Sequence, residues 1–341
     1  MRFFGVGTST DVARAQPVLD SHPSAPIPVV GPGIAEALRV PIGDGGHTAF
    51  PLMLGAAEFG WNVDRESSHA ILDRYAEFGG NAIHTADGYS GGRSEHMIGQ
   101  WLRTRGLRDR MLVSVRIGSH ADHPGLGAVN LVRAVEASLT RLGVEQLDVM
   151  YLDATFDTTT NLEDTLSTVD WLRESGKIST LGAFGLSPEQ LVEARILASA
   201  GYPRIEVLDE PYNLVRRQPF EGDLRLVAGA QGLAMTPSHA LEHGFLSGRY
   251  RSKNASTGVR GEQLRALLNR RGIKILRALD LVSAELDAPM AAVSIAWLLA
   301  QRTVVAPIVN AFAIAHVDEL MQGAGIALSR AQLTELTRAS D

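Results

Sequence analysis

Residues 81–95 read NAIHTADGYSGGRSE, and this stretch decides the expected fold and marks the expected site. It passes from a short apolar segment, Ala82–Ile83, into a polar loop that holds His84 and Tyr89. A glycine pair follows, and a helix is expected to begin at Ser94. A buried strand that ends in titratable side chains and leads into a helix is typical of barrel enzymes, whose chemistry gathers at the C-terminal ends of the strands.

The same alternation of short apolar and longer amphipathic segments continues from Phe50 to the C-terminus. Eight strands are predicted, at Leu52–Leu54, Ala82–Ile83, Leu112–Val115, Val149–Leu152, Thr180–Ala183, Ile205–Leu208, Ala234–Thr236 and Val305–Val309. Amphipathic helical patterns lie between them, the longest over 262–286. This alternation predicts an α/β protein with a single (β/α)8 TIM barrel. An open doubly wound sheet is the alternative, but no G-x-G-x-x-G motif opens a helix.

The first 46 residues differ from the rest of the chain. The segment QPVLDSHPSAPIPVVGPG is rich in proline and small residues, which interrupt helices and strands. We therefore expect an irregular N-terminal extension over 1–46, with one short helix at Ile34–Arg39, and the barrel over 47–341.

Composition excludes several classes of function. The net charge of −6 gives no basic footprint for nucleic acid or an anionic membrane, and the absence of cysteine excludes thiol nucleophiles and disulfides. No apolar run approaches the roughly 20 residues of a membrane span. No secretion signal is recognised in MRFFGVG, so a cytoplasmic protein is expected. A small-molecule substrate is the expected partner, and a homo-oligomer is left open.

Side chains at or just beyond the predicted strand ends form the expected site. In chain order they are Glu58, His84, Tyr89, Arg116, Asp153, Phe184, Asp209, Ser238, His239 and Asn310. Acids, imidazoles, a phenol and a guanidinium at one barrel face indicate an enzyme that moves protons.

The stretch LGAAEFGWNVDRESSHAILDRYAEFGGNAIHTADGYSGGRSEHMIGQWL, together with GKISTLGAFGLSPEQL and GFLSGRYR, resembles the aldo–keto reductases, most of all the bacterial branch with an FGW motif. The resemblance covers about residues 47–341. It implies a barrel that reduces carbonyls with NADPH, using an Asp, a Tyr, a Lys and a His. The Tyr position is kept as Tyr89, whereas the other three positions hold His84, Arg116 and Asp153.

The positions that the resemblance assigns to the cofactor are also changed. The Ser-Asn pair for the carboxamide is Phe184-Gly185, the Gln is Asp209, and the stacking aromatic residue is Ser238. The adenosine phosphate positions hold Phe312, Ala313 and His316. These side chains do not supply the amide and guanidinium partners that such groups need. The prediction is therefore that NADP(H) is not used and that no residue binds a cofactor or a metal.

The leading hypothesis is non-redox acid–base chemistry on a small carbonyl or hydroxyl compound: a dehydration, isomerisation, lyase or cyclisation reaction. Tyr89, His84 and Asp153 are expected to move the proton and Arg116 to stabilise an anion. The expected substrate pocket is formed by Trp61, Phe156, Phe184, Asp209, Ser238 and His239.

Several alternatives stay open. One alternative is an NADPH-dependent oxidoreductase with an atypical tetrad. Another is a catalytically silent barrel with a binding role. Arg116 and Asp153 form only a structural salt bridge, or His239 and His243 join Asp209 at a metal site.

Overall fold

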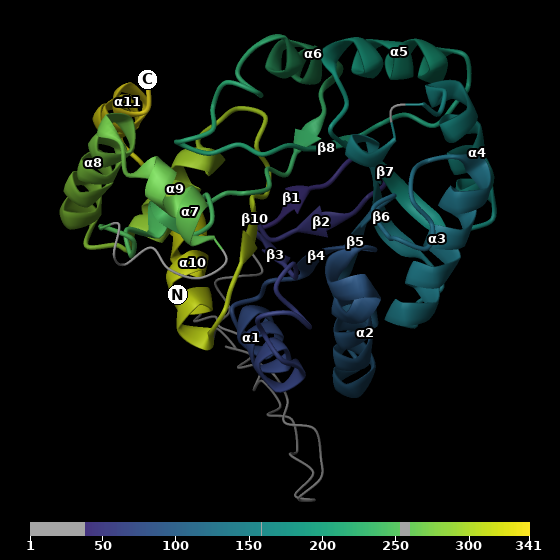
Figure 1. The fold of residues 1–341 in the computed structure, drawn as a ribbon, viewed down its shortest axis with the longest axis horizontal. Coiled ribbons are helices and arrows are strands. Elements are labelled where there is room, and N and C mark those ends of the chain that lie inside the picture. Colours follow the sequence, from purple (N-terminus) through teal and green to yellow (C-terminus); the bar gives the residue numbers. More distant parts are fainter. Residues whose placement is uncertain (1–37, 158, 253–259) are drawn as a thin grey trace, which may run out of the picture.

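Eight parallel strands form the centre of the structure, and helices surround them (Figure 1). The structure is a computed structural model that describes residues 38–157, 159–252 and 260–341. The strands are β3 (Met53–Gly55), β4 (Ala82–Ala86), β5 (Leu112–Ile117), β6 (Leu147–Asp153), β7 (Ile178–Phe184), β8 (Val207–Asp209), β9 (Ala234–Met235) and β10 (Ile308–Asn310). They pair in the order β10-β3-β4-β5-β6-β7-β8-β9.

The sheet closes on itself between β9 and the segment that leads into β10. The Met235 N–H donates to the Thr303 carbonyl and the Val305 N–H to the Met235 carbonyl, both at 2.9 Å. The predicted (β/α)8 barrel is therefore confirmed. Each strand lies within a few residues of its expected range because each is a short apolar run with almost no exposed residue.

The register of three neighbouring strands brings three functional candidates to one level. Asp153 on β6 pairs with Phe184 on β7, and Phe184 pairs with Asp209 on β8. Neighbouring strands lie about 4.8 Å apart, so these side chains form a short row at the C-terminal end of the barrel.

The outer helices alternate with the strands, as predicted. They are α1 (Arg65–Glu77), α2 (Arg93–Arg105), α3 (Ala128–Leu142), α4 (Leu162–Glu174), α5 (Pro188–Ser199), α6 (Asp223–Gln231), α7 (Gly261–Leu267), α8 (Arg270–Leu286), α9 (Met290–Leu299), α10 (Ile314–Gln322) and α11 (Arg330–Ala339). The Ser187 and Gln190 side chains form a capping box at the start of α5. The single long helix expected over 262–286 is wrong, because the Asn269 side chain accepts from the Gly272 N–H and starts a new helix, α8.

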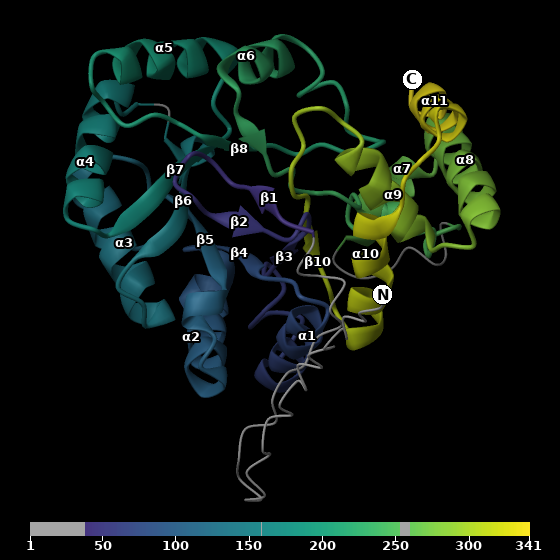
Figure 2. The ribbon, with the colours of Figure 1, turned by 180° about the vertical axis from the view of Figure 1, so that it is seen from behind.

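A short antiparallel hairpin, β1 (Val40–Pro41) and β2 (Thr48–Ala49), covers the N-terminal end of the barrel. Figure 2 shows it in front of the barrel strands. Ile42 and Ala49 are fully buried and pack with Met53 and other side chains of the barrel floor. The expected boundary at residues 46 and 47 falls inside this hairpin. The helix expected at Ile34–Arg39 lies outside the described residues except for its last two, which are not helical.

Among the described residues, no single helix has the length and apolar character to cross a membrane. Helices α8 and α9 have the required length and apolar character only when they are taken together, and their axes are bent by 96° to each other.

Candidate active site

A hollow of about 600 Å³ opens at the C-terminal mouth of the barrel. Six of the ten predicted catalytic and substrate-binding residues line it: Trp61, His84, Tyr89, Arg116, Ser238 and His239. The other four, Asp153, Phe156, Phe184 and Asp209, are not among its lining residues. Asp153, Phe184 and Asp209 lie directly behind the wall, against Arg116.

Tyr89 is held at the mouth by a tight turn after β4. Residues Tyr89–Gly92 form a 3-10 turn in which Ser90, Gly91 and Gly92 have φ values of 53°, 62° and 82°. At Gly92 a side chain is excluded twice, because a Cβ atom would also lie 2.5 Å from the Arg141 side chain. The Asp87 carboxylate ties the turn to the end of β5 by accepting from the Gly118 N–H at 2.9 Å. Tyr89 is thereby fixed beside the end of β5.

Arg116 on β5 is the centre of the site. Its Nη2 donates to the Tyr89 hydroxyl at 2.9 Å. Its Nε lies 3.4 Å from Asp153 Oδ2, and its Nη1 lies 3.8 Å from Asp209 Oδ2. Burial opposes the charge, but Tyr89, Asp209 and Asp153 together raise the pKa of Arg116 above its ordinary value. Arg116 is therefore a permanent cation that contacts the phenol as well as the two acids.

Tyr89 keeps its proton at neutral pH. Burial raises the pKa of its phenol, and the positive charge of Arg116 opposes this only in part. Arg116 favours the phenolate, but desolvation outweighs this attraction.

His84 on β4 faces Asp209 rather than Asp153. Its Nε2 lies 4.0 Å from Asp209 Oδ2, its Nδ1 shares a hydrogen bond with the Ser114 hydroxyl at 3.0 Å, and its ring meets Tyr151 edge-on. Burial and the nearby Arg116 lower the pKa of His84 to about 3. The imidazole is therefore neutral at ordinary pH.

The two aspartates behind the wall have different surroundings. Asp153 accepts from the Thr155 N–H at 3.1 Å and from its hydroxyl at 2.5 Å. Asp209 accepts from the Ser238 N–H at 3.1 Å, while its Oδ2 has no hydrogen-bond donor among the described residues. Burial raises the pKa of Asp209 to about 6. Neither acid lines the hollow: Asp153 acts on the site through Arg116, and Asp209 through Arg116 and His84.

Two predicted substrate contacts have other surroundings. Phe156 is 64% exposed on the short turn after β6, outside the hollow. The Phe184 ring lies under the Arg116 guanidinium, whose central carbon is 4.0 Å from the ring centroid.

Two arginines that were not predicted, Arg249 and Arg260, also line the hollow. The part of the hollow that they line is called its outer half below. Arg249 holds the Glu319 carboxylate at 2.7 and 2.8 Å, and Arg260 holds Glu58 and lies over the Trp61 ring. These arginines stand on long connections after β9, so strand ends give no hint of them. The only signal for Arg249 was its place in the GFLSGRYR stretch.

Three further imidazoles line the hollow. His239 and His243 meet edge-on with their ring centroids 5.1 Å apart, and His316 stands on α10. Among the described residues, no group of three or more His, Asp or Glu side chains has the arrangement to hold a metal ion.

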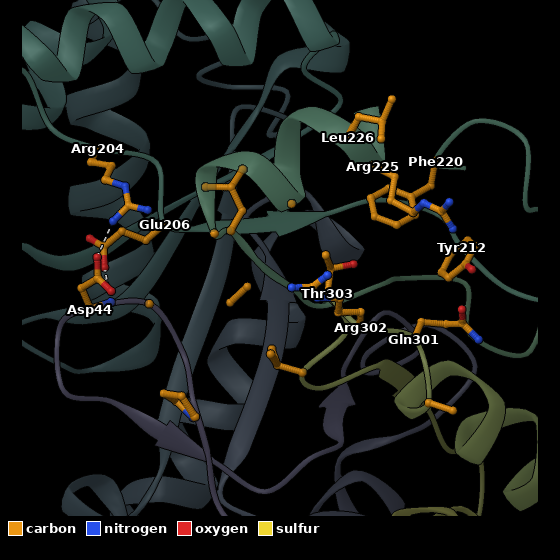
Figure 3. A pocket seen from close by; sticks show the side chains of 18 residues that line it. Asp44, Arg204, Glu206, Tyr212, Phe220, Arg225, Leu226, Gln301, Arg302 and Thr303 are labelled. Carbon is orange, nitrogen blue, oxygen red and sulfur yellow. Dashed lines mark hydrogen bonds and ion pairs between the residues drawn. The ribbon is translucent and has the colours of Figure 1, made fainter. Parts of the chain in front are cut away.

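A second hollow, of about 920 Å³, lies at the opposite end of the barrel beside the β1–β2 hairpin (Figure 3). Three of its charged residues contact one another: Arg204 reaches Asp44 at 2.5 Å, and the Asp44 backbone N–H donates to Glu206 at 2.5 Å. Arg225 and Arg302 line the same hollow. None of the predicted site residues lines it. The N-terminal end of such a barrel normally serves stability, so the mouth is the candidate active site.

Curated relatives are similar over most of their length. The aldo-keto reductase ausK of Emericella nidulans is 30% identical over 85% of this chain and 78% of its own length. The norsolorinic acid reductase of Aspergillus flavus is 25% identical over 92% of this chain and 83% of its own. Norsolorinic acid reductase A of Aspergillus parasiticus is 26% identical over the same shares.

These names correct two expectations. The relatives are reductases, so the non-redox lyase or isomerase reaction inferred from the changed tetrad is wrong. A reductase needs a hydride carrier, which in this family is a nicotinamide, so the expected loss of the cofactor is wrong as well. A nicotinamide cofactor contacts many side chains, so changes at a few of these contacts do not exclude its binding.

The sequence model of the Aldo/keto reductase family matches residues 51–341, which include every strand of the barrel and every residue of its mouth described above. The chain belongs to the aldo/keto reductase family.

Proposed function

We propose that this protein is a nicotinamide-dependent carbonyl oxidoreductase in which the Tyr89 hydroxyl gives its proton to the carbonyl oxygen. The observation that carries this proposal is the 2.9 Å hydrogen bond from Arg116 Nη2 to a protonated Tyr89 at the wall of the hollow. A bound nicotinamide supplies the hydride.

The outer half of the hollow fits an elongated anionic cofactor. Arg249 and Arg260 place two guanidinium groups along it, and each already holds a carboxylate, which shows that their donors can serve an anion. The N-terminal residues of α10 border the same space, where unpaired backbone N–H groups favour negative charge. The stretch 311–317, AFAIAHV, has no cation, but Arg249 and Arg260 come from other parts of the chain.

The proton chemistry is assigned to the chain's own residues. Tyr89 donates from its Oη, and the phenolate that forms gains a charge-assisted hydrogen bond from Arg116 Nη2. Asp153 and Asp209 balance the guanidinium charge from behind the wall. His84 is neutral throughout the ordinary pH range, so it contributes a polar surface and no charge.

Trp61 supports a flat or apolar substrate. Its indole is 54% exposed at the mouth, in the same hollow as Tyr89. An exposed aromatic face beside a proton donor suits a small carbonyl compound with an apolar or aromatic body.

The first test is binding and turnover. Fluorescence titration with NADPH and NADH should show saturable binding, and aromatic aldehydes and ketones should be reduced. Tyr89→Phe should lower kcat/KM by about 100-fold or more, as expected for loss of a general acid, and leave cofactor affinity unchanged. Tyr202→Phe is the matched control, because the hydroxyl of the half-buried Tyr202 bonds Glu163 and Tyr202 does not line the hollow. The proposal fails if neither nucleotide binds, or if Tyr89→Phe reduces carbonyls as fast as the control.

A further inference from the structure

The Arg116 guanidinium lies between two aromatic rings. Its central carbon is 4.0 Å from the centroid of the Phe184 ring and 5.8 Å from that of Tyr89. A guanidinium within about 6 Å of a ring face is attracted by the ring and can stack on it. The Phe184 ring is the nearer of the two, and it is close enough for direct contact.

The two acids beside Arg116 balance its charge without fixing its orientation. Arginine is normally oriented by two parallel hydrogen bonds to one carboxylate. Here Asp153 is 3.4 Å from Nε and Asp209 is 3.8 Å from Nη1, and Nε has no hydrogen-bond acceptor among the described residues. The orientation therefore depends on the Tyr89 hydroxyl in front and on the ring behind.

Phe184 is well placed to orient its neighbour. It ends β7 in register with Asp153 on one side and Asp209 on the other, so its ring stands between the two acids. Gly185 follows with φ +76°, and its N–H is held by Glu210 at 2.9 Å, which fixes the backbone at this point.

We propose that Phe184 is a positioning residue: its ring face keeps the Arg116 guanidinium turned toward Tyr89 instead of toward Asp153 or Asp209. Without the ring, the guanidinium is free to rotate into a two-bond pairing with one of the acids. Nη2 then leaves the Tyr89 hydroxyl, and the phenol loses the cation that stabilises its ionised form. The effect of Phe184 on catalysis rests on the proposed function of Tyr89. The contact of the Phe184 ring with the Arg116 guanidinium is a property of the free protein.

The test reads the Tyr89 hydroxyl directly, without cofactor or substrate. The protein is labelled with tyrosine carrying 13C at its hydroxyl-bearing carbon, and the Tyr89 signal is identified among the six tyrosines by its loss in Tyr89→Phe. The pH titration of that signal is compared in wild type, Phe184→Leu and Phe184→Trp. Phe156→Leu is the matched control, since Phe156 is exposed and makes no contact with Arg116 among the described residues. The other titratable groups that act on the pair are the same in all four proteins: Asp87, Asp153, Asp209, Glu210, His84 and His239.

In Phe184→Leu, the Tyr89 signal should change at neutral pH and its titration should move to higher pH. Phe184→Trp, which keeps a ring face and adds no titratable group, should retain the wild-type titration, as should Phe156→Leu. If Phe184→Leu does not fold by circular dichroism, Phe184→Met takes its place and is judged by the same result. A folded Leu or Met variant with the wild-type Tyr89 titration would overturn the proposal.

The turnover assay separates this inference from the proposed function. If the protein reduces carbonyls, Phe184→Leu should lower kcat about tenfold through the misplaced proton donor, and Phe184→Trp should keep the wild-type value. A protein that reduces no carbonyl but shows the expected titration shift retains the inference and loses the proposed function. The reverse result, turnover without the shift, removes the inference alone.

Discussion

Asp209 shows at the scale of one residue how this site differs from a simple salt bridge. It is fully buried, it shares one arginine with Asp153, and its Oδ2 has no hydrogen-bond donor among the described residues. A buried carboxylate with so few partners disfavours its own ionised form. The folded protein therefore holds the Asp209 proton more tightly than an unfolded chain does.

This difference predicts a pH-dependent stability. Burial raises the pKa of Asp209 from 3.8 to about 6, so the folded state loses stability as the pH rises from about 4 through 6. In Asp209→Asn that loss is absent, while the amide oxygen still accepts from the Ser238 N–H. The free energy of unfolding of Asp209→Asn minus that of wild type should therefore rise by about 3 kcal/mol between pH 4 and pH 7. This figure comes from two pKa units at about 1.4 kcal/mol each.

Urea titrations at the two pH values check this prediction. Asp280→Asn is the control with the opposite pH dependence. The Arg251 hydrogen bond lowers the pKa of Asp280, so removing this carboxylate should reduce the free energy of unfolding more at pH 7 than at pH 4. If Asp209→Asn changes in parallel with wild type at both pH values, the buried acid is not the destabilising group.

At the scale of the element, the connection after β9 shapes the outer half of the hollow. From Ser238 to Arg249 it turns repeatedly, with positive φ at His239, Glu242, His243, Gly244 and Gly248. These turns keep the chain at the rim instead of returning it to the outer layer, and Arg249 then reaches α10 through Glu319. One connection thus supplies imidazoles, glycines and a guanidinium to the place where an anionic cofactor fits.

Arg249→Ala should therefore weaken binding of NADPH, raising its Kd about tenfold for the loss of one guanidinium contact with a phosphate. Arg251→Ala is the control: Arg251 lies two residues further on, pairs with Asp280, and does not line the hollow. Fluorescence titration at two salt concentrations measures both effects, because the Arg249 contribution should shrink as salt screens it. Equal affinities in the two variants would remove Arg249 from the cofactor site.

At the scale of the whole molecule, local signals predict the barrel well and its long-range contacts poorly. Strand β4 and helix α5 are predictable because an apolar run and a Ser-Pro cap are written in adjacent residues. Helix α10 was missed because Ala313 gives it no side-chain cap, and the β1–β2 hairpin was missed because its strands have only two residues each.

The site divides in the same way. Tyr89, His84 and Arg116 were predicted at the mouth because they lie at or just beyond the ends of predicted strands. The pairing of His84 with Asp209, and the arrival of Arg260 at Glu58, depend on contacts across the barrel that no local pattern records. The predicted loss of the cofactor is wrong for the same reason: Phe184, Ser238 and Phe312 can be judged from local motifs, whereas Arg249 and Arg260 reach the hollow from the connection after β9.

The hairpin at the barrel floor and the chemistry at its mouth should be separable by mutation. Ile42 is fully buried between the hairpin and the barrel, so Ile42→Ala should lower the free energy of unfolding by about 3 kcal/mol, the usual loss for a large aliphatic side chain removed from a core. Ile196→Ala makes the same change on α5, where the side chain is 65% exposed, and should stay within about 0.5 kcal/mol of wild type. Urea denaturation followed by circular dichroism measures both.

Below the unfolding transition, Ile42→Ala should keep the wild-type kcat, since the floor and the mouth lie at opposite ends of the strands. A fall in kcat without a fall in stability would show instead that the hairpin acts on the site through the barrel.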